Sequence, residues 1–344
     1  MKHVLVIGGA GYVGSHACLA LAQAGFRPVT YDNLSLGHKD FVRWGPLVHG
    51  DMADTRKIVE TIRAYDIVGV MHFAALAYVG ESVARPAEYY ADNVNGTLSV
   101  LNGVREAGCL PLVFSSSCAV YGEPKIMPIG EHCEKLPINP YGRTKLICEQ
   151  MLADFDHAYG LRSISLRYFN AAGASTEGLI GEKRDPEPHI VPRAIMHAQG
   201  LLPDFKIFGA DFDTPDGTAI RDYTHVSDLS DAHVSAMNLL LQGHATDAFN
   251  LGTGKGSSIL DVVRVVEKVS GTKMPQVSGP RRPGDPAILV ADPRRAKKAL
   301  NFKPKLSDLE TIVRTAWKWH QSLRPTPPSR VEAARSQKKP QHVG

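Results

Sequence analysis

Paired cysteines, long apolar runs and an excess of charge in the body of the chain are all missing from this sequence. Its five cysteines form no Cys-x-x-Cys pair, and an odd number argues against a disulfide framework. No run approaches the roughly 18 apolar residues that a membrane span requires. The N-terminal apolar stretch is too short and too rich in glycine for a signal peptide. These absences predict a cytoplasmic protein with reduced thiols and no membrane partner.

The formal net charge of +4 belongs to one end of the chain. From Arg324 onward there are five basic residues and one acidic residue, so the rest of the chain is about neutral. A nucleic-acid-binding domain carries its basic charge on a folded face. We therefore expect no nucleic-acid partner. The Pro-rich residues 323–344 are predicted to form a disordered basic tail.

Strand and helix patterns alternate along most of the chain, which is typical of an α/β fold with a doubly wound parallel (Rossmann) sheet. A chain of 344 residues exceeds what one core usually organises. We predict that residues 1–173 plus about 222–253 form a dinucleotide-binding domain around this sheet. Residues about 174–221 plus 254–322, rich in Gly and Pro at first, are predicted to form a smaller substrate-binding lobe towards the C-terminus.

A glycine-rich turn follows the first predicted strand. HVLVIGGAGYVGSHACLALAQAGF begins as an apolar strand, turns through Gly8, Gly11 and Gly14, and continues as a helix. Such a turn lets backbone N–H groups approach a pyrophosphate at the helix N-terminus. The second strand ends in Asp32, eighteen residues after Gly14. A carboxylate there accepts hydrogen bonds from the adenosine ribose and repels a 2′-phosphate, which favours NAD over NADP.

Ser117, Tyr141 and Lys145 form the constellation that points to chemistry. Tyr141 and Lys145 are four residues apart and share a helix face, roughly 6 Å apart along the axis. The Lys145 ammonium is expected to lower the pKa of the Tyr141 phenol, so that it can accept a proton from a substrate hydroxyl. Ser117 ends a buried strand, at the sheet edge where ligands bind.

The roles of three further residues, Asp51, Asn93 and Cys118, each allow two interpretations. Asp51 follows a short third strand, where it either reaches the adenine or caps the next turn. Asn93 lies in a helix predicted from about Glu88 to Gly108, with either a packing role or a ligand contact. Cys118, beside Ser117, is interpreted as a small filler rather than a nucleophile. No metal site is predicted.

Together these motifs resemble the extended short-chain dehydrogenase/reductases. HFAALAYVGESV, FSSSCAVYG, NPYGRTK, LRYFNAAGA, RDYTHVSDLSDAH and PRRPGD make the resemblance closest to UDP-glucose 4-epimerases, over about residues 1 to 322. The resemblance implies NAD-dependent interconversion of UDP-glucose and UDP-galactose. Hydride moves from C4 to a resident NAD, the 4-keto sugar turns over, and the hydride returns to its other face. It also implies a homodimer formed through two helices of the first lobe.

The resemblance carries roles to individual positions. Ser117, Tyr141 and Lys145 are the expected catalytic residues. Expected contacts to NAD are Gly8, Gly11, Tyr12, Val13, Gly14, Asp32, Asn33, Asp51, Met52, Phe73, Ala74, Ala75, Asn93, Ser115, Tyr141, Lys145 and Tyr168. Expected contacts to the UDP-sugar are Ser117, Tyr141, Asn170, His189, Ile207, Phe208, Arg221, Tyr223, Arg282, Asp285 and Leu289.

Three positions depart from the family pattern. Ala77 stands where some members have a Lys near the cofactor. His189 stands where many have Asn, which leaves that substrate contact open. Leu289 stands where the size of the side chain controls whether N-acetyl sugars enter, and Leu does not decide the question.

Several alternatives remain at this point. A UDP-pentose 4-epimerase (xylose/arabinose) uses the same catalytic residues, and AYVGES and TPDGT resemble that branch too. A UDP-N-acetylhexosamine 4-epimerase is also open. A sugar-nucleotide dehydratase or decarboxylase is disfavoured, because Cys118 and Ala119 supply no acid or base after Ser117. A non-catalytic NAD-binding sensor is disfavoured because the Ser, Tyr and Lys set is intact.

Overall fold

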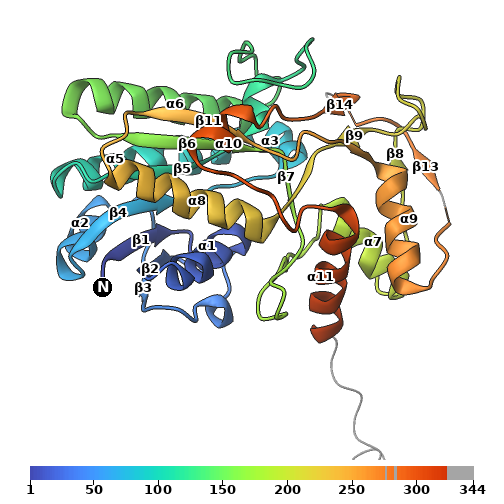
Figure 1. Ribbon diagram of the computed structural model, residues 1–344, viewed down its shortest axis with the longest axis horizontal. Coiled ribbons are helices and arrows are strands. Elements are labelled where there is room, and N and C mark those ends of the chain that lie inside the picture. Colours follow the sequence, from blue (N-terminus) through green and yellow to red (C-terminus); the bar gives the residue numbers. More distant parts are fainter. Residues whose placement is uncertain (276, 283–284, 324–344) are drawn as a thin grey trace, which may run out of the picture.

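Seven parallel strands form the centre of the structure, a computed structural model that describes residues 1–275, 277–282 and 285–323 (Figure 1). They lie in the order β11-β6-β5-β4-β1-β2-β3. Because the strand order reverses between β1 and β4, the turn after β1 lies at the switch point where such sheets bind ligands. The predicted doubly wound parallel sheet is confirmed. The bounds are β1 His3–Ile7, β2 Arg27–Asp32, β3 Leu47–His49, β4 Ile67–His72, β5 Leu112–Ser117, β6 Ser163–Tyr168 and β11 Asp247–Leu251.

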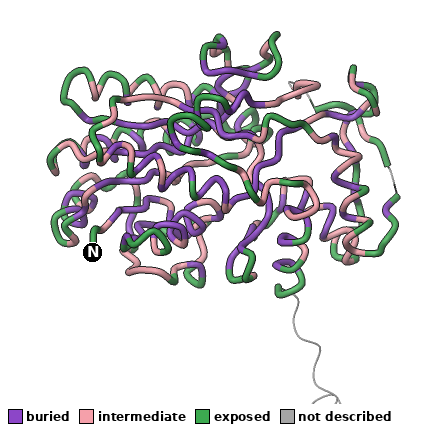
Figure 2. The backbone as a smooth tube through the Cα atoms, in the orientation of Figure 1, coloured by how far each residue is buried: buried purple, intermediate pink, exposed green. Residues whose placement is uncertain are grey.

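Helices cover both faces of this sheet, and most residues of its strands are buried (Figure 2). On one face, α1 (Tyr12–Gln23) and α8 (Val226–Leu241) pack against each other and against the strands. On the other face lie α2 (Thr55–Ala64), α5 (Gly96–Glu106) and α6 (Pro140–Tyr159). The two resulting cores hold the sheet rigid, and the carboxyl ends of its strands remain available for a site.

The start of α6 is determined by two adjacent residues. Asn139 accepts a hydrogen bond from the Gly142 N–H at 2.8 Å, and Pro140 occupies the first helical position, where its missing N–H costs nothing. Tyr141 therefore lies in the first turn of the helix and Lys145 one turn later. The helix ends at Gly160, whose φ of +71° suits glycine.

A buried ion pair holds α6 against the sheet. Nε of Arg167 on β6 donates to Oε1 of Glu149 on α6 at 2.8 Å, and both side chains are under 10% exposed. Arg167 also donates to the phenol of Tyr121 at 2.8 Å. Removing one partner of such a pair costs about 3–5 kcal/mol because the other charge stays buried. The pair thus fixes the helix that carries Tyr141 and Lys145.

The helix predicted from about Glu88 to Gly108 is interrupted. It begins earlier, as α4 (Pro86–Tyr89), passes through a turn of π-helix at Tyr90–Asn95 and continues as α5. A short helix, α3 (Val79–Ala84), precedes it. The wider π turn contains Asn93, and such turns are frequent at functional sites.

A second group of helices lies at the other end of the molecule (Figure 1). It consists of α7 (Ile190–Ala198), α9 (Ile259–Ser270) and α11 (Leu309–Ser322), which bury a separate apolar core. The remaining strands and α-helix are β7 Asn170–Ala172, β8 Ile207–Phe208, β9 Ile220–Arg221, β10 Tyr223–His225, β12 Ser257–Ser258, β13 Ser278–Gly279, β14 Ile288–Leu289 and α10 Arg294–Ala299, and two short 3-10 helices span Lys39–Phe41 and Cys118–Tyr121. The predicted disordered tail falls almost wholly on residues 324–344, outside the described part.

All five cysteines are free thiols, as predicted, and only Cys109 is not fully buried. Within the described residues, no helix combines the length and the apolar character needed to cross a bilayer.

Candidate active site

A cavity of about 1140 Å³ opens along the carboxyl ends of the central strands. Its wall includes residues that directly follow β1, β2 and β4, and it continues to β8, β9 and β14. Ligand sites for one small molecule usually measure about 300–1,000 Å³. The cavity therefore has room for two ligands side by side. Every residue predicted above to bind cofactor or substrate lines it, except Asn93.

The glycine turn after β1 is as tight as its sequence predicts. Gly8 has a φ of +82°, and a Cβ there would lie 2.5 Å from the backbone N of Ala74. A Cβ at Gly14 would lie 2.2 Å from the Gly8 carbonyl oxygen. A side chain at Gly8 would displace the backbone at Ala74, and a side chain at Gly14 would displace the backbone at Gly8.

The N-terminus of α1 fits an anionic group. Gly11 is its N-cap, so no side chain caps the helix, and the first turn contains no acidic residue. The first N–H groups of a helix have no intrahelical partner, and Gly11 and Tyr12 both line the cavity. The helix dipole adds partial positive charge there. This turn fits the diphosphate of a dinucleotide.

Asp32 supports the same turn from the end of β2. Its Oδ2 accepts the Ala10 N–H at 3.0 Å and its Oδ1 accepts the Leu34 N–H at 2.8 Å. The carboxylate is 8% exposed and lines the cavity, so it can also accept from a ribose hydroxyl. Asp51 bonds Asn33 at 2.8 Å and the Ala53 N–H at 2.9 Å. Asp51 therefore caps the next turn while it lines the cavity.

Asn93 lies behind the cavity wall. Its amide accepts the Leu76 N–H at 2.8 Å and donates to the Leu76 carbonyl and to the Thr144 hydroxyl, each at 3.0 Å. With 1% of its surface exposed, it ties the loop after β4 to α6. The structure thus gives Asn93 the packing and hydrogen-bonding role, in support of a loop whose residues Phe73, Ala74 and Ala75 line the cavity.

Ser117, Tyr141 and Lys145 meet at the end of β5. Nζ of Lys145 lies 5.9 Å from the centroid of the Tyr141 ring and donates to the Ser115 carbonyl at 2.8 Å. Tyr141 and Ser117 are 9% and 8% exposed and face the same cavity. Ser115 in turn is hydrogen-bonded to the phenol of Tyr168. The pairing predicted from helix periodicity is therefore present in space.

The electrostatics differ from the expectation that Lys145 lowers the pKa of Tyr141. Burial raises the pKa of Tyr141 well above its usual value, the neighbouring Tyr168 raises it further, and a hydrogen bond with Ser117 opposes the shift. Burial also lowers the pKa of Lys145 to about 8. The phenol is thus neutral at pH 7 in the unliganded protein, and an added positive charge in the cavity is needed to make it a base.

The far end of the cavity contains arginines. Arg221 on β9 pairs with Asp285, and Arg282 lies over the ring of Phe208 at 4.5 Å. Burial lowers the pKa of Arg282, and the nearby Asp285 opposes that shift. Guanidinium groups offer paired donors to phosphate oxygens. Arg221 and Asp285 were both predicted to contact the UDP moiety, and their pairing with each other was not predicted.

A charged cluster in the cavity wall was missed by sequence reasoning. Nε of Arg184 donates to Glu182 at 2.8 Å, and Nδ1 of His189 lies 2.8 Å from the same carboxylate and 3.3 Å from Glu187. The two carboxylates and the imidazole come within 4.8 Å of one another. The signal in the sequence is GEKRDPEPH, in which charged residues crowd around two prolines.

His189 is held in its charged form by this cluster. Burial lowers its pKa, but the Glu182 carboxylate at 2.8 Å and then Glu187 outweigh that effect and raise the pKa to about 9. His189, and after it Arg184, lower the pKa of Glu182 to about 2 against the effect of burial. In contrast, burial lowers the pKa of His233 to about 4. A neutral Asn at position 189 would not carry this charge.

Cys118 is buried beside Ser117. Burial raises the pKa of its thiol to about 12, with a smaller opposing effect from Arg221. A thiol of this kind is not ionised at neutral pH and is a poor nucleophile. This agrees with its interpretation as a filler.

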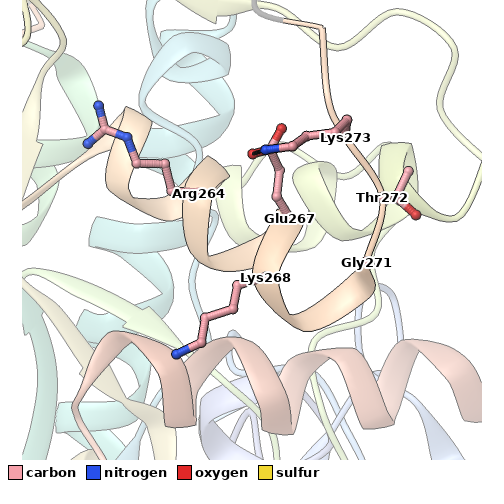
Figure 3. A pocket seen from close by; sticks show the side chains of 6 residues that line it. All are labelled: Arg264, Glu267, Lys268, Gly271, Thr272 and Lys273. Atoms are coloured by element: carbon pink, nitrogen blue, oxygen red, sulfur yellow. Dashed lines mark hydrogen bonds and ion pairs between the residues drawn. The ribbon is translucent and has the colours of Figure 1, made fainter.

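A second hollow, of about 320 Å³, lies on the surface at the end of α9 (Figure 3). Lys273 and Glu267 form an ion pair there at 3.0 Å, and Arg264 and Lys268 are exposed to solvent. No residue predicted from the sequence to have a role lines this hollow.

The charge of His189 can be tested by NMR titration. In the unliganded protein its imidazole is expected to titrate near pH 9, because nearby carboxylates favour the charged form. Glu182→Gln should lower that midpoint, and His189→Gln identifies the resonance. His233, with its pKa near 4, serves as the internal comparison. A His189 midpoint at or below its ordinary value of about 6.5 would contradict the ion pairing.

Known proteins resemble this chain in sequence and in fold. UDP-glucose 4-epimerase from Rhizobium leguminosarum bv. trifolii is 50% identical over 317 residues, which cover 92% of this chain and 97% of that protein. The crystal structure of UDP-glucose 4-epimerase from Brucella ovis in complex with NAD is 53% identical and has a TM-score of 0.90, covering 92% of this chain and 98% of that chain. The enzyme from Bifidobacterium longum, in complex with NAD+ and UDP, is 36% identical with a TM-score of 0.89, covering 94% and 99%.

A sequence model of the NAD dependent epimerase/dehydratase family matches residues 4–252, which include the glycine turn, Asp32, Ser117, Tyr141 and Lys145. That match covers more than half of the chain, and the relatives above cover more than nine tenths of it. The chain belongs to the NAD dependent epimerase/dehydratase family.

Proposed function

We propose that this protein is an NAD-dependent 4-epimerase that interconverts UDP-glucose and UDP-galactose through a 4-keto sugar. The observation that carries the proposal is the meeting of Ser117, Tyr141 and Lys145 at one end of a cavity large enough for two ligands. Relatives at 50% and 49% identity carry the name UDP-glucose 4-epimerase. The names of these relatives favour it over the pentose and N-acetyl alternatives, because the catalytic residues alone do not separate it from a UDP-pentose 4-epimerase.

The chain's own groups perform the proton chemistry. Tyr141 takes the proton from the C4 hydroxyl of the sugar and returns it after the sugar has turned over. Ser117, whose hydrogen bond lowers the pKa of the buried phenol, shares the proton path. NAD, when bound, supplies the hydride acceptor and a positively charged ring. Because hydride and proton both return to the sugar, there is no net oxidation.

The burial of Tyr141 gives this step a dependence on the cofactor. A phenol whose pKa is raised by burial is not a base on its own. Lys145 is 3% exposed and its Nζ donates to the Ser115 carbonyl, so its charge is held at a fixed point. A second positive charge beside the buried phenol acts strongly on it, because the dielectric is lower around a buried group than in water. The base is thus active only in the loaded enzyme.

Substrate binding is assigned to the far end of the cavity. Arg221 and Arg282 bind the diphosphate of UDP, with Asn170, His189, Ile207, Phe208, Tyr223, Asp285 and Leu289 around the nucleotide and sugar. The protonated His189 donates to an oxygen of the ligand, which an Asn at this position would also do but without charge. The dinucleotide contacts are assigned to the residues given above, with Asn93 acting through the loop after β4.

A dehydratase or decarboxylase is not favoured. Elimination needs an acid and a base beside the reacting carbon. Cys118 and Ala119, which follow Ser117, supply neither, because the thiol has a pKa of about 12.

The activity is tested by incubating the purified protein with UDP-galactose and no added NAD. We expect UDP-glucose to form, because the cofactor stays bound. Tyr141→Phe should be at least about 100-fold slower in kcat, since it removes the acid–base group. Tyr159→Phe, on the exposed end of the same helix, is the matched control and should keep full activity. Equal rates for Tyr141→Phe and the parent would reject Tyr141 as the base, and no product with NAD added would reject the proposed function.

The role of Asp32 is tested by Asp32→Asn, which keeps one acceptor oxygen for the turn and removes the charge. We expect NAD to bind about 10-fold more weakly, because a hydrogen bond to a charged acceptor is lost. Discrimination against NADP should fall as well. Asp154→Ala, an exposed change on α6, is the control. Unchanged affinities for both dinucleotides would exclude the proposed ribose contact.

We also propose that the protein acts in the cytoplasm, in galactose metabolism, as a homodimer. Free thiols at all five cysteines suit a reducing compartment. The resemblance to the family supports the dimer, and Leu98 of α5 is an apolar side chain left 38% exposed on a helix of the large domain. Light scattering should give twice the mass of one chain, and the mass of a single chain would reject the dimer.

A further inference from the structure

The segment Gly181–His189, called the strap below, forms part of the cavity wall opposite the glycine turn. It connects the short strand region after β7 to the start of α7 and has no regular structure of its own beyond an isolated bridge at Gly181. The strap residues that line the cavity are Glu182, Lys183, Arg184, Pro186, Glu187, Pro188 and His189.

One side of the strap is attached to the loop after β2. Nε2 of His38 lies 2.9 Å from the Lys183 carbonyl oxygen. Nζ of Lys183 lies 4.0 Å from Asp40. Behind it, the indole N–H of Trp319 donates to the Glu182 carbonyl at 2.8 Å. These contacts fix the backbone at Glu182 and Lys183.

The next residue reaches the loop after β4. Nη1 of Arg184 donates to the phenol of Tyr78 at 3.0 Å, and its guanidinium lies 5.2 Å from the centre of that ring. In the sheet, β1 lies between β2 and β4. A segment that contacts the loops after both neighbours therefore passes over the end of β1, where the glycine turn and the N-terminus of α1 lie.

Arg184 retains donors for a ligand. Nε is bonded to Glu182 and Nη1 to Tyr78, and Nη2 has no partner among the described residues. The side chain is 22% exposed, which leaves one face towards the cavity.

The charge of Arg184 acts on the first residue of α1. Burial raises the pKa of Tyr12, Glu182 raises it further, and the Arg184 guanidinium opposes the shift. Its influence also reaches the buried phenols of Tyr141 and Tyr168. The hydrogen bond to Tyr78, after β4, and the contact of the adjacent Lys183 with His38, after β2, place Arg184 at the end of the cavity beside the glycine turn. Arg221 and Arg282 belong to the other end, with β9 and Phe208.

We propose that the strap closes over the resident dinucleotide and that Arg184 binds its diphosphate from the side opposite the N-terminus of α1. This proposal rests on the proposed function, which supplies the ligand. A guanidinium offers a phosphate two parallel N–H donors, and the N-terminus of α1 offers the same phosphate backbone N–H donors from the opposite side. The anion is then held between two partly positive surfaces.

The acidic members of the cluster position this cation. Glu182 accepts from Nε of Arg184 and is 6% exposed, so the guanidinium is held in one orientation. The Glu182 carboxylate lies 2.8 Å from both Nε of Arg184 and Nδ1 of His189, so its negative charge faces two cationic groups. Burial and the neighbouring Glu182 raise the pKa of Glu187, which disfavours a second negative charge beside the diphosphate.

The experiment compares how long variants keep their NAD. Arg184→Gln removes the charge, and Arg184→Lys retains it without the paired donors. Glu182→Gln/Arg184→Gln removes both partners, so that no buried carboxylate loses its cation and folding is protected. Arg264→Gln is the matched control, because Arg264 is an exposed arginine on α9 outside the cavity (Figure 3). NAD content per chain after gel filtration and the rate of NAD release are measured for each, together with KM for UDP-galactose at saturating NAD.

We expect Arg184→Gln and the double variant to release NAD at least about 10-fold faster than the parent, since each loses a charge-assisted bond to phosphate. Arg184→Lys should fall between them and the parent, and Arg264→Gln should match the parent. Parent-like release from both glutamine variants would overturn the proposal. A raised KM for UDP-galactose with parent-like NAD release would also overturn it, because Arg184 would then bind the diphosphate of the substrate.

Measurements on the parent protein distinguish a failure of the strap proposal from a failure of the proposed function. If the parent carries NAD and converts UDP-galactose, parent-like release from the variants rejects only the strap. If the parent neither carries NAD nor converts the sugar, the proposed function itself fails.

Discussion

Burial of ionisable side chains at the end of β5 is the constraint on which the site depends. Tyr141 and Lys145 are only 9% and 3% exposed, so the charged form of each is costly, and the pKa of the phenol rises while that of the amine falls to about 8. A solvent-exposed pair would have ordinary pKa values and would respond little to a bound ligand. In this cavity a positive charge brought by a ligand acts at low dielectric, so the loaded and unloaded proteins differ in reactivity.

The fold positions these buried groups beside the cavity and also supplies the strap that we propose closes over the cofactor. The sheet sets the glycine turn at its switch point, and the ion pair between Arg167 and Glu149 holds α6 in register beside it. The strap then covers the turn from above, fixed by His38 on one side and by Tyr78 on the other. If the strap closes over the glycine turn as proposed, it both retains the cofactor and limits the access of water to the site.

Local patterns predicted most of the site, and long-range contacts account for the rest. The glycine turn, Asp32 and the Tyr141 and Lys145 pair depend on spacing within one strand–turn–helix or one helix. The strap could not be predicted in this way, because its sequence has no helical or strand periodicity. Its Arg184 donates a hydrogen bond to Tyr78, which is 106 positions away in the chain. The pKa of Tyr141 could not be predicted either, since burial is the sum of contacts from several elements. The π turn at Asn93 likewise has no sequence signature.

The central claim is that the hydrogen on C4 leaves as hydride and the same hydrogen returns to C4, so that no proton from solvent enters that position. The most direct measurement is turnover of UDP-galactose in D2O, with the product examined by NMR. The account predicts protium at C4 of the UDP-glucose formed, because the hydrogen returns from a carrier closed off from water. Deuterium at C4 would contradict it, since the inversion would then proceed by exchange with solvent.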